Sequence, residues 1–324
     1  MARFALGPEH AGLRLDKVLT QLIPGTSRGA AQRWIREGRV RLNAQACRPK
    51  HEVSAGDVVE AEPGPALPST ALPDASVQLS VLFEDEHLIV VDKPPGLVVH
   101  PARGHWQGTL VNGLLARPGM SPDLADPEDP GGALRPGIVQ RLDKDTSGVL
   151  VVAKDAVTRE GLKEQLSARE MERQYWAIVI GDCASGRIDT MHARHPRSRI
   201  KFTSRTSEGK VAITEITRVE SLFDGLATLV TCRLETGRTH QIRVHLAEQR
   251  NTPLLADTVY GRKLSDPKLL AAEAAIGRQA LHARVLGFVH PVSGKALRFA
   301  AGFPADFVSA LRALGSQTAL PTEP

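Results

Sequence analysis

One stretch constrains this chain more than any other: residues 141–148, Arg-Leu-Asp-Lys-Asp-Thr-Ser-Gly, run directly into the apolar segment Val-Leu-Val-Val at 149–152. The apolar segment is short, mostly β-branched and uninterrupted, which predicts a buried strand rather than a helix. The charged residues therefore lie where a turn leads into a core strand. Rigid elements often hold active-site residues on such loops, but the same string is typical of a solvated turn. Local pattern alone leaves both interpretations open.

A calcium loop is excluded for this stretch. Asp143, Asp145, Ser147 and Gly148 occupy loop positions one, three, five and six, but position twelve is Lys154, where a bidentate glutamate is required. A phosphoryl-transfer Asp-x-Asp-Thr motif fits poorly, because that chemistry needs the aspartates at the carboxyl end of a buried strand. Here the strand follows the aspartates, and no glycine-rich phosphate loop is present.

Composition places the chain among ordinary globular proteins. Of its 324 residues, 42% are hydrophobic and 24% charged, and no apolar run is long enough to span a membrane. The three cysteines are far apart, with no Cys-x-x-Cys spacing, so neither a disulfide framework nor a zinc site is indicated. We expect a cytoplasmic protein with reduced thiols, outside any membrane.

The positive charge is concentrated in two segments. Residues 28–50 hold seven Lys or Arg against one acidic residue, and residues 187–210 hold seven against two. A single basic run is usually a solvated surface. Two such runs in one chain favour a polyanionic partner such as nucleic acid.

Residues 1–62 are predicted to form a small α/β domain. Apolar spacing predicts a first helix near residues 13–22, and Ser27 can cap a second helix over residues 28–37. That second helix would present Arg28, Arg33 and Arg36 outward, which suits contacts to a nucleic-acid backbone. Residues 63–76 are rich in proline and are predicted to be a semi-rigid linker.

Residues 77–315 are predicted to form an α+β domain with a mostly antiparallel sheet, because strand patterns dominate and no regular βαβ alternation occurs. Helices are predicted near residues 109–116, 158–169 and 304–314. Another is expected to begin near residue 239, with Thr239 as its cap. The basic segment 187–210 is expected to be a loop or hairpin, and residues 316–324 a loose tail.

Residues 141–148 resemble the signature of the RluA-type pseudouridine synthases, and four further stretches match that family in the expected order. These are residues 92–101, Asp-Lys-Pro-Pro-Gly-Leu-Val-Val-His-Pro; residues 175–181; residues 234–245, with the unusual run Gly-Arg-Thr-His-Gln-Ile-Arg-Val-His; and residues 279–294. The N-terminal region resembles an S-four-type RNA-binding module. That combination is similar to the subgroup that acts on large ribosomal RNA.

The resemblance implies roles for three residues in a reaction that needs no metal or organic cofactor. Asp143 matches the catalytic carboxylate, which can act as a nucleophile or as a base at the sugar. Arg243 matches the arginine that pairs with it, and a guanidinium favours the ionised carboxylate. Tyr175 matches the tyrosine that stacks on the target base.

The resemblance also implies RNA contacts. Because the target base must leave its stack, Arg141 matches the arginine that fills the vacated space. Arg238 and His240 belong to the same RNA-facing run. His240 and His245 are expected to form hydrogen bonds rather than bind a metal. The chain departs from the family pattern at Gln140, usually a histidine, and before Asp257, where a glycine is usual.

The sequence therefore predicts a monomeric RNA pseudouridine synthase that acts on ribosomal RNA. A non-enzymatic alternative uses the same basic segments: an RNA-binding factor in ribosome assembly.

Overall fold

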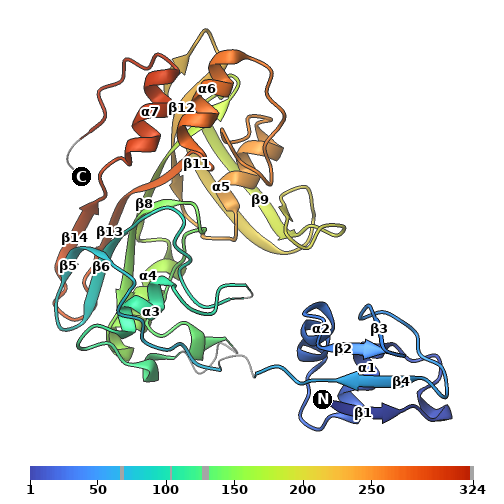
Figure 1. The fold of residues 1–324 in the computed structure, drawn as a ribbon. Helices are drawn as coiled ribbons and strands as arrows, with labels where there is room; N and C mark the ends of the chain where they lie inside the picture. The colour runs from blue at the N-terminus through green and yellow to red at the C-terminus, as the bar shows by residue number, and fades with distance from the viewer. Residues whose placement is uncertain (66–68, 103, 126–130, 322–324) are drawn as a thin grey trace. The chain divides into compact units, whose positions relative to one another are not determined.

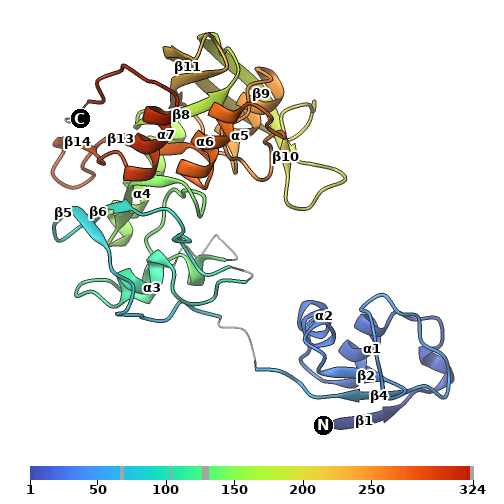
Figure 2. The same cartoon turned by 45° about the horizontal axis from the view of Figure 1, so that its top comes forward.

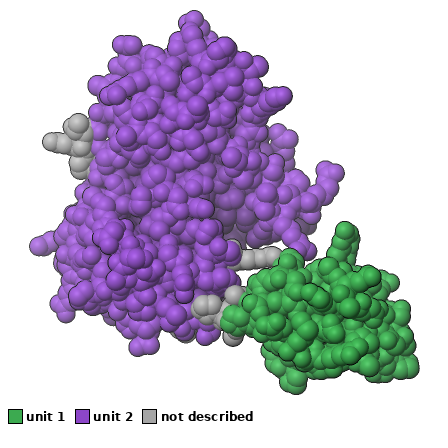
Figure 3. All heavy atoms as spheres, in the orientation of Figure 1, with its two compact units in different colours: residues 1–68 green, residues 69–324 purple. Residues whose placement is uncertain are grey.

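The computed structural model describes residues 1–65, 69–102, 104–125 and 131–321. The chain divides into two compact units, residues 1–68 and 69–324, which are drawn in different colours in Figure 3. None of the helices within the described ranges is long and apolar enough to cross a membrane.

Unit 1 is a four-stranded antiparallel sheet with two helices (Figure 1). Its elements are β1 (Ala2–Ala5), the short turn η1 (Pro8–His10), α1 (Leu15–Leu22), α2 (Arg28–Arg36), β2 (Val40–Leu42), β3 (Gln45–Ala46) and β4 (Val58–Ala61). Ser27 caps α2 by accepting the Ala30 amide, as its position predicts. Leu15, Leu19 and Trp34 belong to the core between the helices and the sheet.

Unit 2 is built on a ten-stranded sheet. Strands β10 to β5 follow the order β10-β9-β11-β12-β8-β13-β7-β6-β5, and β14 also pairs with β13. The strands are β5 (Ser80–Glu84), β6 (Leu88–Lys93), β7 (Ser147–Ala153), β8 (Glu172–Ile180), β9 (Gly186–Arg194), β10 (Phe202–Thr203), β11 (Lys210–Leu222), β12 (Ala227–Leu234), β13 (Leu281–Val289) and β14 (Ala296–Ala300). Among the described residues, every pairing is antiparallel except that of β13 with β7. The predicted fold class, α+β with a mostly antiparallel sheet, is confirmed.

Helices cover both faces of this sheet (Figures 1 and 2). They are α3 (Leu110–Leu115), α4 (Ala156–Ala168), α5 (Gln241–Val244), α6 (Pro267–Ile276) and α7 (Ala305–Ala313), with the short turns η2 (Pro122–Leu124) and η3 (Gly132–Leu134) and the π-helical turn η4 (His245–Gln249). Strand β8 divides its side chains between two cores. Tyr175 and Val179 point to one core, while Trp176 and Ile178 point to the other, beneath α6 and α7.

The strand predicted behind the central stretch is confirmed, because all seven residues of β7 are buried. Gly148 in this strand has φ +118°, and a Cβ there would lie 2.0 Å from the Ala283 carbonyl oxygen. Glycine is therefore required for the close parallel approach of β7 and β13.

Several sequence expectations differ from the structure. Helix α5 begins after His240, which has φ +59° and no side-chain capping bond, so Thr239 is not its cap. The basic segment does contain a hairpin, formed by the end of β9 with β10, but its first part is a regular strand of the sheet, because β9 also pairs with β11. Neither helix α6 nor strand β13 is among the elements predicted from the sequence, although Asp266 is an ordinary start signal and Gly277 an ordinary stop signal for α6.

The expected linker and tail also pack against the units. Ala71 is buried and its amide donates to Ala133, and Asn112 donates to the Leu72 carbonyl. At the other end, Glu220 accepts hydrogen bonds from residues 316–318. Backbone groups that find protein partners in this way are fixed, so residues 71–74 of the predicted semi-rigid linker pack into unit 2, and residues 316–318 are not a loose tail.

Candidate active site

The loop that carries Asp143 is supported from below by a buried lysine. Lys93, at the end of β6, is fully buried and donates hydrogen bonds to the carbonyl oxygens of Pro94, Leu97 and Lys144, at 2.8, 2.9 and 2.9 Å. Burial lowers the pKa of Lys93 to about 7. The loop closes as a turn, because the Thr146 amide donates to the Asp143 carbonyl at 3.1 Å. Asp143 lies shortly before the first residue of β7, and its loop is therefore held in place by Lys93 of β6 and by its own turn.

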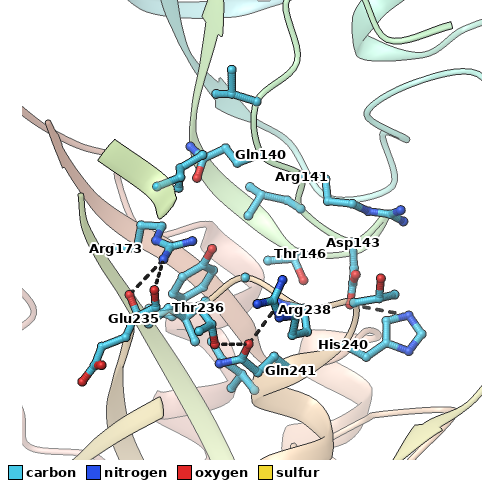
Figure 4. A pocket seen from close by; sticks show the side chains of 18 of the residues that line it. Gln140, Arg141, Asp143, Thr146, Arg173, Glu235, Thr236, Arg238, His240 and Gln241 are labelled. Atoms are coloured by element: carbon cyan, nitrogen blue, oxygen red, sulfur yellow. Dashed lines mark hydrogen bonds and ion pairs between the residues drawn. The ribbon is translucent and has the colours of Figure 1, made fainter. Parts of the chain in front are cut away.

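Arg243 is held in the first turn of α5 by a separate network of neutral groups. The Gln241 amide oxygen accepts from the Thr236 hydroxyl at 2.8 Å and from the Arg238 backbone N–H at 3.0 Å, and its nitrogen donates to Ile213 and Thr214. Figure 4 shows the Thr236 and Arg238 bonds to Gln241. Because every polar atom of this buried side chain is satisfied, the start of α5 is tied firmly to β11.

Arg243 joins two carboxylates. Its Nε and Nη2 donate to Asp257 at 2.8 and 2.9 Å, and its Nη1 donates to Asp143 Oδ2 at 2.9 Å. Burial lowers the pKa of Arg243, but the hydrogen bonds and charges of both aspartates outweigh burial and raise it. For Asp257, burial raises the pKa, but the hydrogen bonds and charge of Arg243 outweigh burial and lower it. The Asp257 side chain is fully buried, whereas that of Asp143 is 17% exposed, so only Asp143 presents its carboxylate to solvent.

Tyr175 lies on β8 and lines the same pocket as Asp143. Burial raises its pKa to about 12, the charge of Arg173 lowers it, and that of Asp143 raises it. The phenol therefore keeps its proton at neutral pH. Arg173, two residues earlier, donates to the Leu234 and Glu235 carbonyls at 3.3 and 2.9 Å and packs beside the pocket (Figure 4).

The pocket is a cavity of about 540 Å³, a size that holds a small organic group. Six residues singled out from the sequence line it: Asp143, Tyr175, Arg243, Arg141, Arg238 and His240. Arg141 is exposed on the same loop as Asp143, and Figure 4 shows both side chains at the pocket. The structure thus brings together residues that lie a hundred positions apart.

The three arginines predicted on α2 belong to unit 1. Arg28 and Arg36 are exposed, and Arg28 also lies 3.2 Å from the buried Asp16 carboxylate. Arg33 is half-buried, because it donates to the Pro65 carbonyl at 2.6 Å and lies near Glu37. Of the three, Arg28 and Arg36 retain the outward position that was expected.

The two histidines of the α5 segment make hydrogen bonds. His245 is fully buried between the hydroxyls of Thr190 and Thr214, at 3.0 and 2.8 Å. His240 Nδ1 lies 3.0 Å from the Tyr260 hydroxyl, and its Nε2 lies 3.9 Å from Asp143 Oδ2. Both rings therefore have the hydrogen-bonding surroundings that the sequence analysis expected.

Sequence reasoning missed three residues that shape this site: Lys93, Asp257 and Tyr260. In the sequence, Lys93 belongs to a stretch that matches the family. Asp257 stands out only for the residue before it, and no pattern marks it as a partner of Arg243. The available signal was that Asp257 is an acidic residue close in sequence to Arg243, but nothing in the spacing indicates that the two side chains meet.

Chemically, the pocket offers a solvent-accessible carboxylate held against a fixed guanidinium, beside a protonated phenol and several cationic side chains. An ionised carboxylate in this setting can act as a nucleophile or as a base on a polyanionic substrate. The surrounding arginines suit phosphate groups.

Comparisons with known proteins agree with this chemistry. A model of the RNA pseudouridylate synthase family matches residues 87–248, and an S4 domain model matches residues 13–59. The chain is 43% identical to ribosomal large subunit pseudouridine synthase D of Xanthomonas campestris, over 99% of this chain and 95% of that protein. It is 40% identical to the uncharacterized RNA pseudouridine synthase YlyB of Bacillus subtilis, over 94% and 95%.

Among solved structures, human RNA pseudouridylate synthase domain containing 4 is similar, with a TM-score of 0.53 and 26% identity over 73% of this chain and 93% of that one. The fold, the pocket and the near full-length sequence identity agree. This chain belongs to the RNA pseudouridylate synthase family.

Proposed function

We propose that this chain converts specific uridines of large-subunit ribosomal RNA to pseudouridine, with Asp143 as the catalytic carboxylate. Support for the substrate comes from relatives that are 40–43% identical over 96–99% of this chain and are named ribosomal large subunit pseudouridine synthase D. The match of residues 13–59 to an S4 domain adds an RNA-binding module to the catalytic unit.

The observation that carries the role of Asp143 is its pairing with Arg243 inside an open pocket. The two side chains lie 2.9 Å apart, and Arg243 is in turn held by the buried Asp257. Arg243 therefore cannot swing away from Asp143 without breaking a buried ion pair. The carboxylate is kept charged and aimed, yet remains open to a substrate.

The proposed reaction is an isomerisation that balances without a co-reactant. The bond from uracil N1 to the ribose C1′ breaks, with Asp143 acting at the sugar as nucleophile or base. The base rotates, its C5 forms the new bond to C1′, C5 loses its proton and N1 gains one. While the base is detached, water must be kept away from the ribose C1′, because it would compete with C5 for that carbon.

Other pocket residues are assigned to the RNA. Tyr175 would stack on the extruded base and lie beside C5, where it would assist removal of the C5 proton. Arg141, exposed on the Asp143 loop, would occupy the space that the flipped nucleotide leaves. Arg238 and His240 would contact the flanking backbone.

The proposal extends to the whole chain. The exposed Arg28 and Arg36 of unit 1 would bind RNA phosphates, with Arg33 supporting the helix end through Pro65. A monomer in the cytoplasm, where ribosomal RNA is made and modified, suits this substrate.

The test is Asp143→Asn in the full chain, with Asp145→Asn as the matched control. Both change an aspartate of the same loop to its neutral isostere, but the Asp145 side chain does not line the pocket. We expect Asp143→Asn to abolish pseudouridine formation on ribosomal RNA while binding in a gel-shift assay is retained. Asp145→Asn should keep turnover.

Chemical mapping of pseudouridine in ribosomal RNA from cells that lack the protein provides the second arm. One or more missing pseudouridines are expected, and they should return with the wild-type gene but not with Asp143→Asn. A full complement of pseudouridines in those cells would instead favour the non-catalytic assembly factor.

A further inference from the structure

Tyr260 meets three parts of unit 2 although it does not line the pocket. Its hydroxyl accepts the Phe202 amide at 2.8 Å and lies 3.0 Å from His240 Nδ1. The Arg243 guanidinium lies over its ring, with the guanidinium carbon Cζ 5.3 Å from the ring centroid. Its own amide donates to Asp257 Oδ1 at 3.0 Å. The residue is therefore fixed by the same buried aspartate that fixes Arg243.

The Phe202 amide belongs to the basic hairpin, defined here as residues 194–205. The Phe202 ring stacks on His192, with centroids 5.5 Å apart and an angle of 8° between the planes, and Arg194 lies over its ring at 4.8 Å. The edge of Phe202 also contacts His240, 5.8 Å away. Because His192 is bonded to the Thr239 carbonyl at 2.9 Å, the hairpin is seated directly on the segment that carries His240.

The hydrogen-bond pattern determines which nitrogen of His240 carries the proton. The Tyr260 oxygen already accepts the Phe202 N–H. Burial raises the pKa of this phenol to about 12, so it keeps its own proton at neutral pH. Within the described ranges, His240 Nδ1 is the acceptor within reach of that proton. A hydroxyl that donates to Nδ1 leaves the proton of a neutral imidazole on Nε2.

The surroundings of His240 keep its ring neutral and pointed at the site. Burial lowers its pKa, Asp143 raises it and Arg243 lowers it again, and the net direction is down. The backbone at His240 is left-handed, with φ +59°, a conformation that is strained for a non-glycine residue. Such strain is typical of functional positions. With the ring so placed, Nε2 faces Asp143 Oδ2 across 3.9 Å, a gap that a substrate oxygen can bridge.

We infer that Tyr260 is a positioning residue: its hydroxyl fixes His240 with the proton on Nε2, facing Asp143, and couples that state to seating of the basic hairpin through Phe202. The inference rests on the proposed catalytic role of Asp143. Through Tyr260, RNA contact at the basic hairpin is connected to the geometry around the Asp143 carboxylate. Tyr260 itself does not touch the substrate.

The direct test is the protonation pattern of His240 in the full chain, read from ¹⁵N imidazole chemical shifts. The His240 signals are assigned by their loss in His240→Gln. In the wild type we expect the Nε2–H form. Tyr260→Phe keeps the ring over Arg243 but removes the hydroxyl, so a mixture of the two neutral forms is expected. An Nδ1–H form in the wild type, or an unchanged spectrum in Tyr260→Phe, would overturn the inference.

Kinetics on saturating RNA separates positioning from binding and folding. Tyr260→Phe should lower kcat about tenfold, the size expected when a reacting group loses its orientation, with KM changed less than about threefold. In a His240→Gln background the same change should have no further effect, because Tyr260 acts through His240. Thr258→Val, which removes an exposed hydroxyl two residues away, is the matched control and should keep the wild-type kcat.

The outcomes distinguish the two levels of the proposal. If the wild-type chain forms pseudouridine but the kcat losses of Tyr260→Phe and His240→Gln add up in the double variant, the role of Tyr260 alone is overturned. A wild-type chain that formed no pseudouridine would remove the proposed function, and the positioning role with it, even if the His240 signals moved as expected. An unchanged melting temperature in Tyr260→Phe would show that the loss of kcat is not a loss of fold.

Discussion

At the scale of single residues, Arg243 does two different tasks with one guanidinium. Two of its nitrogens are committed to Asp257, whose side chain is fully buried, and a third is offered to the partly exposed Asp143. A fully buried bidentate pair is costly to break from one side, because an uncompensated charge remains. The pair thus serves as the anchor, and the bond to Asp143 is the part that the substrate can reach.

We predict that Asp257→Asn lowers the free energy of unfolding by about 3 kcal/mol, because the amide leaves the buried guanidinium underpaired. It should also reduce turnover sharply. Urea denaturation and a pseudouridine assay measure both effects. Glu172→Gln is the control: Glu172 pairs with Arg298 in the same two-bond geometry, but both side chains are more than a third exposed. An exposed pair contributes about 0–1 kcal/mol, so equal losses in the two variants would contradict the anchoring role.

A second residue-scale prediction concerns acid. His282 is fully buried between the Ser147 hydroxyl and the Ala301 carbonyl, and burial lowers its pKa to about 4. Between pH 6.5 and 4 the unfolded chain binds a proton here and the folded chain does not, so stability must fall as the pH falls through this window. The shift corresponds to about 3 kcal/mol. His245, with a pKa of about 4 for the same reason, adds to the slope in the same direction.

Denaturant unfolding at several pH values measures this slope. His282→Gln should be less stable than the wild type at pH 7, yet should lose less stability between pH 6.5 and 4, since one of the two histidines is gone. Parallel pH profiles for the two proteins would contradict the assignment.

At the scale of elements, the active-site loop depends on the parallel pairing of β7 with β13. β7 and β13 meet at His282 with Ser147 and at Ala283 with Gly148. Gly148 is the position where the two backbones come so close that a Cβ would overlap the Ala283 carbonyl. The register of β7, and with it the place of Asp143 five residues earlier, follows from this contact.

We therefore predict that Gly148→Ala prevents β7 from pairing with β13 and costs more than about 4 kcal/mol, since it adds both a backbone clash and a strained φ. Gly294→Ala is the control. Gly294 also has a positive φ, +69°, but a Cβ there would meet open space. That control should lose only about 1–2 kcal/mol. The yield of folded protein and the urea midpoint compare the two, and similar values would refute the close-approach explanation.

The elements also show how far sequence reasoning reaches. Apolar runs such as those of β6, β7 and β8 predict their strands, because strands buried on both faces are typically rich in apolar residues. The sequence pattern does not predict β13, because His282 and Arg284 interrupt its apolar run although both are fully buried. Their polar atoms find partners such as Ser147 and Ala301, which lie far away in the sequence.

The candidate site divides in the same way. Motif resemblance pointed to Asp143, Tyr175 and Arg243, and the structure places all three at one pocket. Tyr260 and Asp257 could not be assigned, since their importance lies in contacts to Arg243 and His240 that only the folded chain creates. The left-handed backbone at His240 was likewise hidden, because a helix-start pattern implies ordinary capping.

At the scale of the whole molecule, each unit has its own apolar core. Within the part of the chain that the structure describes, the apolar core of unit 1 is made of residues from the first 61. Unit 1 also buries Asp16 fully, paired with Arg14 and Arg28. Burial raises the pKa of Asp16, but these arginines and Gln32 outweigh burial and lower it. The cores of unit 2 draw on no residue of unit 1. Neither unit therefore needs the other to bury its apolar residues.

This independence leads to a prediction about the division of labour. A chain that lacks residues 1–68 should fold and should keep kcat on a short saturating RNA within about threefold, since the reacting groups all lie in unit 2. Its affinity for ribosomal RNA should fall. The full chain carrying Arg28→Gln and Arg36→Gln should reproduce most of that fall, because each arginine is expected to contact one phosphate. Each lost contact should also make the slope of log affinity against log salt concentration less steep by about one.

The measurement is RNA affinity at a series of salt concentrations for the three proteins, with kcat measured in parallel. If removing residues 1–68 abolished turnover on the short RNA at saturation, unit 1 would have to complete the catalytic pocket rather than serve as a binding module. If the double arginine variant bound RNA like the wild type, the contacts of unit 1 would have to come from another surface. With both results as expected, substrate capture belongs to unit 1 together with the basic hairpin, and the chemistry belongs to Asp143 and the residues that hold it.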